Sequence, residues 1–219
     1  MSDLKHILCY GDSLTWGWVP TKEGAPTTRY PYEQRWTGVM ARQLGSDYRI
    51  IEEGLSARTT SADDPNDPRL NGAAYLPSAL ASHLPLDLVI VMLGTNDTKA
   101  YFGRSPFDIA TGMSVLLGQV AASAGGVSTN HPAPRALVVS PPPLGDIPDP
   151  WFRELFAGGR EKTLALPALY ASLARFVGAA CFDAGSATST GGVDGIHLTA
   201  QDNADLGQAL APVVEGLLS

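Results

Sequence analysis

The sequence has little charge and no long hydrophobic run. Lys, Arg, Asp and Glu make up 17% of its 219 residues, against about 25% in an ordinary domain. The net charge is −7, so the chain lacks the basic surface that binds DNA or RNA. No apolar run reaches the roughly 18 residues that span a membrane, and an apolar content of 44% excludes a disordered chain. The length fits one domain, residues 1–219.

Cysteine is scarce as well. Cys9 and Cys181 each lie beside or within an apolar run, as buried, reduced thiols do. The sequence has no Cys-x-x-Cys zinc motif and no Walker A phosphate-binding loop, and its histidines are dispersed, so we expect no metal and no cofactor. The N-terminus lacks the basic, apolar and small-residue regions of a signal peptide, and we therefore expect a cytoplasmic protein.

What the sequence does contain is an alternation of two kinds of segment. Five short apolar runs predict strands, since nearly continuous runs are typical of parallel sheets buried on both faces. They span His6 to Tyr10, Tyr48 to Glu52, Leu86 to Leu93, Leu137 to Ser140 and Ala179 to Asp183. Helical spacing is found at Trp36 to Leu44, Ile109 to Val120, Leu164 to Val177 and Leu206 to Leu218. The alternation predicts an α/β domain with a parallel sheet.

Proline and glycine mark where these segments break. We expect Pro167 and Pro212 to shorten or kink the last two helices. Three stretches rich in Pro, Gly, Asp and Thr predict long irregular loops: Gly17 to Arg35, Ser61 to Pro77 and Pro141 to Gly159. Long loops in a compact domain are usually lids or contact surfaces.

Polar side chains follow the predicted strands, where open α/β sheets bind their ligands. Ser13 follows the first strand, Asn96 follows the third, and Asp194 and His197 follow the fifth. Each has an ordinary alternative: Ser13 as a helix N-cap, Asn96 as a turn former, and the Asp194/His197 pair as loop residues. We interpret Asp97 as a cap for the segment after it.

Taken together, these residues favour nucleophilic catalysis. A serine at a helix N-terminus lies near unpaired N–H groups that can hold an oxyanion. Among the four histidines, His197 follows Asp194 by three residues, and Asp194 can orient its imidazole. An amide at Asn96 can donate to the same oxyanion. Nucleophile, base and oxyanion donor thus fall at one sheet edge, without the G-x-S-x-G of α/β-hydrolases.

The segments around these residues resemble the GDSL, or SGNH, hydrolases. Gly11-Asp12-Ser13-Leu14 is similar to the first block of that family, and Ile51 to Thr60 is similar to the second. Gly94-Thr95-Asn96-Asp97 resembles the third block, and Asp194-Gly195-Ile196-His197 resembles the fifth. The longer segments Cys9 to Trp18, Glu53 to Thr59 and Leu93 to Lys99 resemble the bacterial arylesterase branch. The resemblance implies a flavodoxin-like three-layer αβα sandwich with a five-stranded parallel sheet, the SGNH hydrolase fold.

The same resemblance implies a role for each candidate residue. Ser13 would be the nucleophile, His197 the base and Asp194 its orienter. The oxyanion hole would consist of the Asn96 side chain and the backbone N–H groups of Ser13 and Ala57. Many members carry glycine where this chain has Ala57. The alanine keeps the N–H donor, but a positive φ at that position would disfavour it.

The arylesterase branch further implies a homo-oligomer, with an octamer as the candidate size, whose loops build a narrow hydrophobic access channel. Ordinary loop packing is the alternative for the loop aromatics. The residues expected to contact substrate are Trp18, Thr95, Trp151, Phe152 and Ile196.

The expected function is that of a serine esterase for short-chain, acetyl-type esters. Its acyl-enzyme would be resolved by water, an alcohol or hydrogen peroxide, since the branch is known for acyltransferase and perhydrolase activity. A carbohydrate O-acetyl esterase of the same fold is the alternative. A flavodoxin-like nucleotide- or flavin-binding module would leave Ser13, Asn96 and His197 unexplained. The roles of Arg58 and Lys99 stay open, and salt-bridged scaffold residues are the ordinary interpretation of both.

Overall fold

One parallel sheet organises the chain, and a computed structural model describes it at residues 4–22 and 26–219. The five strands run in parallel in the order β2-β1-β3-β4-β5. They are β1 (Lys5–Gly11), β2 (Tyr48–Gly54), β3 (Leu88–Met92), β4 (Arg135–Ser140) and β5 (Ala180–Asp183). All five predicted strands are confirmed, and β3 is buried along its whole length.

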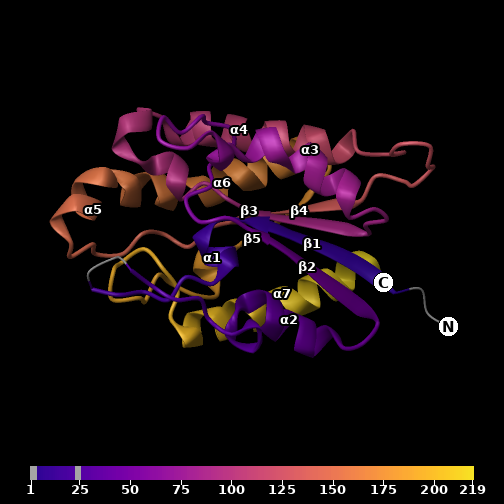
Figure 1. Cartoon of the computed structure of the whole chain (residues 1–219), viewed down its shortest axis with the longest axis horizontal. Coiled ribbons are helices and arrows are strands. Elements are labelled where there is room, and N and C mark those ends of the chain that lie inside the picture. Colours follow the sequence, from indigo (N-terminus) through magenta and orange to yellow (C-terminus); the bar gives the residue numbers. More distant parts are fainter. Residues whose placement is uncertain (1–3, 23–25) are drawn as a thin grey trace.

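Helices cover both faces of this sheet (Figure 1). One face carries α3 (Gly72–Ser82), α4 (Pro106–Ala121) and α6 (Gly159–Val177), and the other carries α2 (Trp36–Leu44) and α7 (Ala200–Leu218). Two short helices, α1 (Ser13–Trp16) and α5 (Pro150–Leu155), lie toward the end of the molecule where the strands finish. The predicted three-layer αβα sandwich is confirmed.

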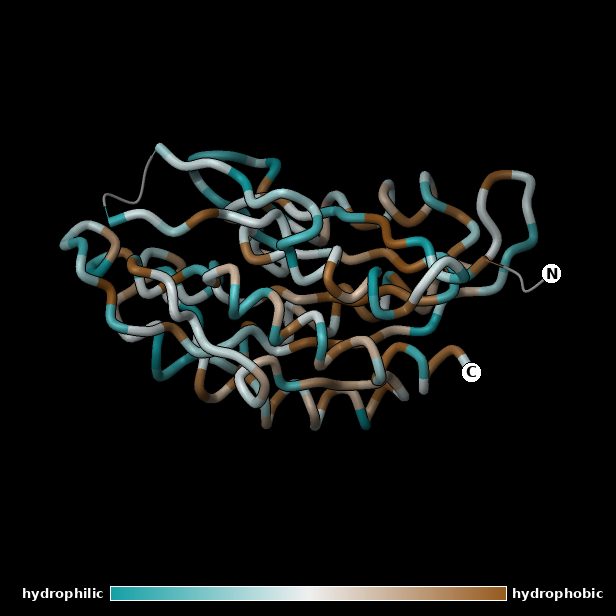
Figure 2. Tube along the Cα trace, turned by 90° about the horizontal axis from the view of Figure 1, so that it is seen from below, coloured by the Kyte–Doolittle hydropathy of each residue, from teal (hydrophilic) through white to brown (hydrophobic). Residues whose placement is uncertain are grey.

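The strand pleat divides the core into two layers. In β1, Leu8 and Tyr10 pack with the α3–α4–α6 layer, while Ile7 and Cys9 pack with the α2–α7 layer, because successive side chains point to opposite faces. Hydrophobic and hydrophilic residues alternate around the helical turns (Figure 2), so each helix buries one stripe. Cys181 packs against the layer opposite to Cys9, and both thiols are free.

Pro167 and Pro212 do not shorten their helices as expected. Helix α6 continues past Pro167, and α7 continues past Pro212. Each proline removes one helical hydrogen bond. The buried stripe on both sides of it, such as Leu210 and Val214 in α7, holds the helix against the sheet, and tertiary packing supplies most helix stability.

Two of the three predicted loops contain helices, so those loop predictions are wrong in part. Helix α3 starts inside the stretch 61–77, where Asn71 Oδ1 accepts from the N–H groups of Ala73 and Ala74. Helix α5 lies inside 141–159, capped by Asp149 with proline in its first turn. Asn, Asp and Pro signal helix starts as well as turns. The third stretch, 17–35, is irregular apart from an isolated bridge between Trp18 and Arg29 and a 3₁₀ turn at Tyr32–Gln34, and its residues 23–25 lie outside the described part.

Candidate active site

Ser13 is the first residue of α1, directly after the carboxyl end of β1. The N-cap of this helix is Asp12, whose Oδ1 accepts from the N–H of Leu14 over 2.9 Å, so the N-cap alternative for Ser13 is wrong. Gly54 at the end of β2 lets α1 approach closely, because a Cβ there would lie 2.4 Å from the nitrogen of Trp16. The serine is buried, with 7% of its surface exposed.

His197 and Asp194 join Ser13 in a hydrogen-bonded chain. Nδ1 of His197 lies 2.7 Å from Oδ2 of Asp194, and Nε2 lies 2.9 Å from Oγ of Ser13. The other carboxylate oxygen accepts from the N–H groups of Ile196 and His197, both over 2.9 Å. Since an ionised carboxylate only accepts, Nδ1 carries the proton and Nε2 is free to accept the Ser13 hydroxyl proton.

A carboxylate and an aromatic ring flank the imidazole of His197. Burial raises the pKa of Asp194, but hydrogen bonds and the charge of His197 lower it by more. The pKa therefore lies below its ordinary value. Asp194 therefore stays ionised opposite the ring. Trp18 stacks on His197, with ring centroids 5.1 Å apart and planes at 17°. An aromatic face stabilises a cation placed over it.

Donors for an oxyanion line the same cavity as Ser13. Asn96, 6% exposed, begins a 3₁₀ turn after β3. Within the described residues, the backbone N–H groups of Ser13 and Ala57 form no hydrogen bond, so they are available to a developing negative charge. Ala57 has a φ of 71°, a left-handed conformation that costs a residue with a Cβ. Such strain persists where the surrounding structure enforces it.

Arg58, the next residue, helps to hold Ala57 in its left-handed conformation. Its guanidinium is buried and donates to the carbonyl of Gly11 over 2.8 Å and to that of Glu53. It also lies over the ring of Tyr10, 4.1 Å from the centroid. Arg58 thereby joins the ends of β1 and β2. Its scaffold role rests on backbone carbonyls and an aromatic ring.

Two further carboxylates are buried beside the site. Burial raises the pKa of Asp12 to about 7 and that of Asp97 to about 6. The prediction that Asp97 caps the segment after it is wrong: its carboxylate accepts from the N–H and hydroxyl of Thr60, over 2.9 and 2.6 Å, and pairs with Arg104. A fully buried carboxylate needs several partners, and the chain supplies them from distant segments.

Lys99 lies next to these carboxylates and lines the cavity. Its Nζ is 3.9 Å from Oδ2 of Asp64. Burial lowers the pKa of Lys99, while the charges of nearby Asp64, Asp12 and Asp97 oppose that shift. The pairing with Asp64 agrees with the interpretation of Lys99 as a salt-bridged scaffold residue. The side chain also lines the cavity.

The Ser13–His197 pair opens into a cavity of about 160 Å³. Of the predicted contact residues, Trp18, Phe152 and Ile196 line it. Thr95 is buried away from the cavity, and Trp151 is 77% exposed at the surface. Neighbours on a helix point in different directions, so Phe152 faces the cavity and Trp151 does not.

Several lining residues were missed by the sequence analysis. They are Ser56, Leu155 and Phe156. Leu155 and Phe156 follow Phe152 at the third and fourth positions, the spacing of one helix face. That signal was present in the sequence but lies in the stretch interpreted as a loop.

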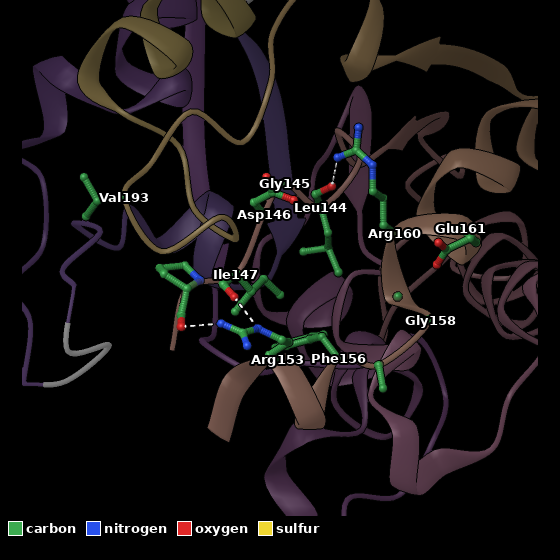
Figure 3. Close-up of a pocket in the computed structure, with 13 residues that line it drawn as sticks. Leu144, Gly145, Asp146, Ile147, Arg153, Phe156, Gly158, Arg160, Glu161 and Val193 are labelled. Atoms are coloured by element: carbon green, nitrogen blue, oxygen red, sulfur yellow. Dashed lines mark hydrogen bonds between the residues drawn. The ribbon is translucent and has the colours of Figure 1, made fainter. Parts of the chain in front are cut away.

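A second cavity, of about 560 Å³, shares Phe156 with the first (Figure 3). Arg153 and Arg160 direct their guanidinium groups to backbone carbonyls at its edge: Arg153 to Ile147 and Pro148, Arg160 to Leu144. Its lining residues include no serine, cysteine, histidine or lysine. Its lining thus offers no serine with a histidine base, so the smaller cavity is the candidate active site.

An αβα sandwich with a serine after its first strand and an Asp-x-x-His pair near its last helix defines the class of SGNH-type serine hydrolases. The profile of the GDSL-like lipase/acylhydrolase family matches residues 9–203. The chain belongs to this family. It is accordingly an enzyme of the SGNH serine hydrolase type, as the sequence analysis predicted.

Solved structures agree with this assignment. The native M. smegmatis aryl esterase is 66% identical, covers 98% of this chain and 100% of its own, and superposes with a TM-score of 0.97. Est24, a carbohydrate acetylesterase from Sinorhizobium meliloti, is 64% identical, with coverages of 97% and 99% and a TM-score of 0.96. A carbohydrate acetylesterase family member from the same organism is 40% identical, with coverages of 98% and 99% and a TM-score of 0.90. A comparison with curated protein sequences gives no match.

These likenesses confirm the predicted SGNH fold and the arylesterase-type family. Among residues 4–22 and 26–219, no helix has the length and apolar character needed to cross a bilayer.

Proposed function

We propose that this enzyme cleaves short-chain, acetyl-type carboxylic esters through an acyl-enzyme on Ser13. The observation that carries the proposal is the hydrogen-bonded chain from Asp194 through His197 to Ser13, at 2.7 and 2.9 Å, opening into a small cavity. Nucleophile, base and orienter within hydrogen-bond reach are the signature of an activated serine.

In the first step, His197 Nε2 takes the Ser13 proton as Oγ attacks the ester carbonyl. Asp194 stabilises the imidazolium that forms, and the face of Trp18 adds to this. The carbonyl oxygen becomes an oxyanion held by the backbone N–H groups of Ser13 and Ala57 and the amide of Asn96. His197 then protonates the leaving alcohol, which leaves Ser13 acylated.

In the second step, His197 activates an acceptor that attacks the acyl-enzyme. Water gives hydrolysis, an alcohol gives acyl transfer, and hydrogen peroxide gives a peracid. The cavity walls are largely apolar, with Phe152, Leu155, Phe156 and Ile196 among them. Walls of this kind limit bulk water near the ester and support transfer to alcohols and peroxide as part of the proposed activity.

The preference for short acyl groups follows from the size of the cavity. Sites that enclose drug-sized ligands measure roughly 300 to 1,000 Å³, and this cavity holds about 160 Å³. An acetyl group fits such a volume, whereas a long acyl chain requires the wall to open.

The test is a comparison of p-nitrophenyl acetate with p-nitrophenyl octanoate, in water and with added alcohol. We expect acetate to turn over at least about tenfold faster, since each excluded methylene is worth ~1–3 kcal/mol. Added alcohol should yield its acetyl ester. Equal turnover of the two substrates would contradict the short-chain assignment, and free acetate as the sole product would contradict transfer.

Acetylated carbohydrate is the second candidate substrate. Its support is the 64% identity to Est24, which is described as a carbohydrate acetylesterase. Acetate release from acetylated sugars, measured beside p-nitrophenyl acetate, decides between the two. A kcat/KM at least about tenfold higher on the sugars would make them the substrate class.

We also propose that the protein assembles into a homo-oligomer, with the octamer as the candidate size. Trp151 and Val193 expose 77% and 53% of their surface, and each is an apolar side chain that a contact between subunits could cover. Light scattering after gel filtration gives the mass directly, and a monomeric mass would contradict the proposal. A cytoplasmic location stays a prediction.

A further inference from the structure

The orientation of the Asn96 amide is set by two acceptors. Its Nδ2 donates to Oδ2 of Asp12 and to the backbone carbonyl of Arg58, each over 3.2 Å. With the amide turned over, Oδ1 would face a carboxylate and a carbonyl at once, which leaves buried acceptors unpaired. The nitrogen is therefore held on the side of these groups.

Asp12 uses both carboxylate oxygens. Oδ1 accepts from the N–H of Leu14 as the cap of α1, and Oδ2 accepts from Asn96. The residue is 1% exposed, and Arg58, Lys99 and Asp97 are the charged groups that act on it. Its two oxygens thus connect the segment that carries the nucleophile with the segment that carries the amide.

We propose that Asp12 is a positioning residue for the reaction, and that it acts through Asn96 by holding the amide nitrogen toward the oxyanion. The inference rests on the proposed function, in which Asn96 is an oxyanion donor. The two N–H bonds of the Asn96 amide already have two acceptors, Asp12 and the carbonyl of Arg58. The oxyanion of a tetrahedral intermediate would be a third. Both existing contacts are long, at 3.2 Å, which leaves the amide able to share one of its N–H bonds with the oxyanion without turning.

Asp12→Asn separates the two contacts of this residue. Asparagine caps helices as well as aspartate does, so its Oδ1 can keep the bond to Leu14. Its NH₂ group then faces the NH₂ group of Asn96, and two donors oppose each other. We expect kcat for p-nitrophenyl acetate to fall about 100-fold, as for loss of one oxyanion donor, with KM within about twofold and Tm nearly unchanged.

The decisive measurement is the same substitution in an Asn96→Ala background. If Asp12 acts through Asn96, Asp12→Asn lowers kcat of the Asn96→Ala enzyme by less than about twofold. A loss as large as in the wild-type background would overturn the inference, since Asp12 would then act on Ser13 through α1. Wild-type kcat in Asn96→Ala alone would instead refute the oxyanion role of Asn96, a failure of the proposed function.

A second variant covers the case in which Asp12→Asn does not fold. Asp12→Ser keeps a capping oxygen and leaves Asn96 with the Arg58 carbonyl alone. The same two backgrounds apply, with the same expected non-additivity. An additive loss in this pair would overturn the inference equally.

Discussion

The two faces of the sheet and its carboxyl edge are built in opposite ways. On the faces, strand residues such as Val89 and Ile90 are wholly buried among apolar side chains from the helices. At the edge, the buried groups include Asp12, Arg58, Asp97 and Lys99. Apolar burial stabilises the fold, whereas burying charge costs free energy. Stability is concentrated in the faces and chemistry in the edge, so mutations in the two regions should have different consequences.

The largest effect is expected for Ser13→Ala at the edge. Loss of the nucleophile should lower kcat on p-nitrophenyl acetate by about 10⁴-fold or more, while Tm stays within a few degrees because one hydroxyl is removed. Steady-state assays and thermal melts measure the two quantities. A variant with near-wild-type kcat would contradict the nucleophile assignment.

Ile90→Ala tests the apolar core on the faces of the sheet. Ile90 is fully buried in β3, and such truncations cost ~2–5 kcal/mol in the free energy of unfolding. Turnover per folded molecule should remain near wild type. Denaturant unfolding gives the stability, with Phe176→Ala as the control, because Phe176 is 89% exposed and surface changes stay within about 0.5 kcal/mol. Equal losses of unfolding free energy in Ile90→Ala and Phe176→Ala would contradict the conclusion that stability is concentrated in the faces of the sheet.

Phe156→Ala tests whether the cavity wall limits the length of the acyl chain. Phe156 belongs to both cavities, so its removal should connect the smaller one with the larger. We expect the octanoate-to-acetate ratio of kcat/KM to rise about tenfold, within the range for relieving a steric limit. In the exposed aromatic control Phe176→Ala, the ratio should stay constant. A constant ratio in Phe156→Ala as well would place the length limit elsewhere.

A further prediction concerns the pH dependence of stability. The pKa of Asp12 is raised from 3.8 to about 7 in the folded protein, so the folded state holds a proton that the unfolded state releases. This contribution lowers the stability of the wild type as pH rises from about 4 to about 7. In Asp12→Asn it is absent, and Arg58, Asp97 and Lys99 are common to both proteins. The stability of the variant relative to wild type should therefore rise over that window in denaturant titrations. A difference that is flat with pH would contradict the raised pKa.

The same two regions differ in how far the sequence predicts them. The strands are local apolar runs, and all five are recognisable from the residues alone. Ser13, Asn96, Asp194 and His197 could be placed at one edge because parallel strands end together. Helices α3 and α5 were not predicted, because their capping residues Asn71 and Asp149 are equally good turn formers.

Contacts between distant segments account for the rest. The stacking of Trp18 on His197 and the bond from Asn96 to Asp12 join segments far apart in the chain, and no local pattern encodes them. The left-handed Ala57 is similar, because alanine avoids that conformation on its own and the surrounding structure imposes it. Buried Asp97 was predicted to cap the segment after it, yet its partners are Thr60 and Arg104.

The acyl-enzyme itself is the most direct test of the account. The wild-type protein should be mixed with p-nitrophenyl acetate, quenched in acid within the first turnovers, digested and examined by mass spectrometry, with Ser13→Ala treated identically. We expect an acetyl group on the peptide that contains Ser13, localised to that residue, and none in the variant. Rapid turnover without an acetylated Ser13, or an acetyl group on another residue that forms at the turnover rate, would contradict it.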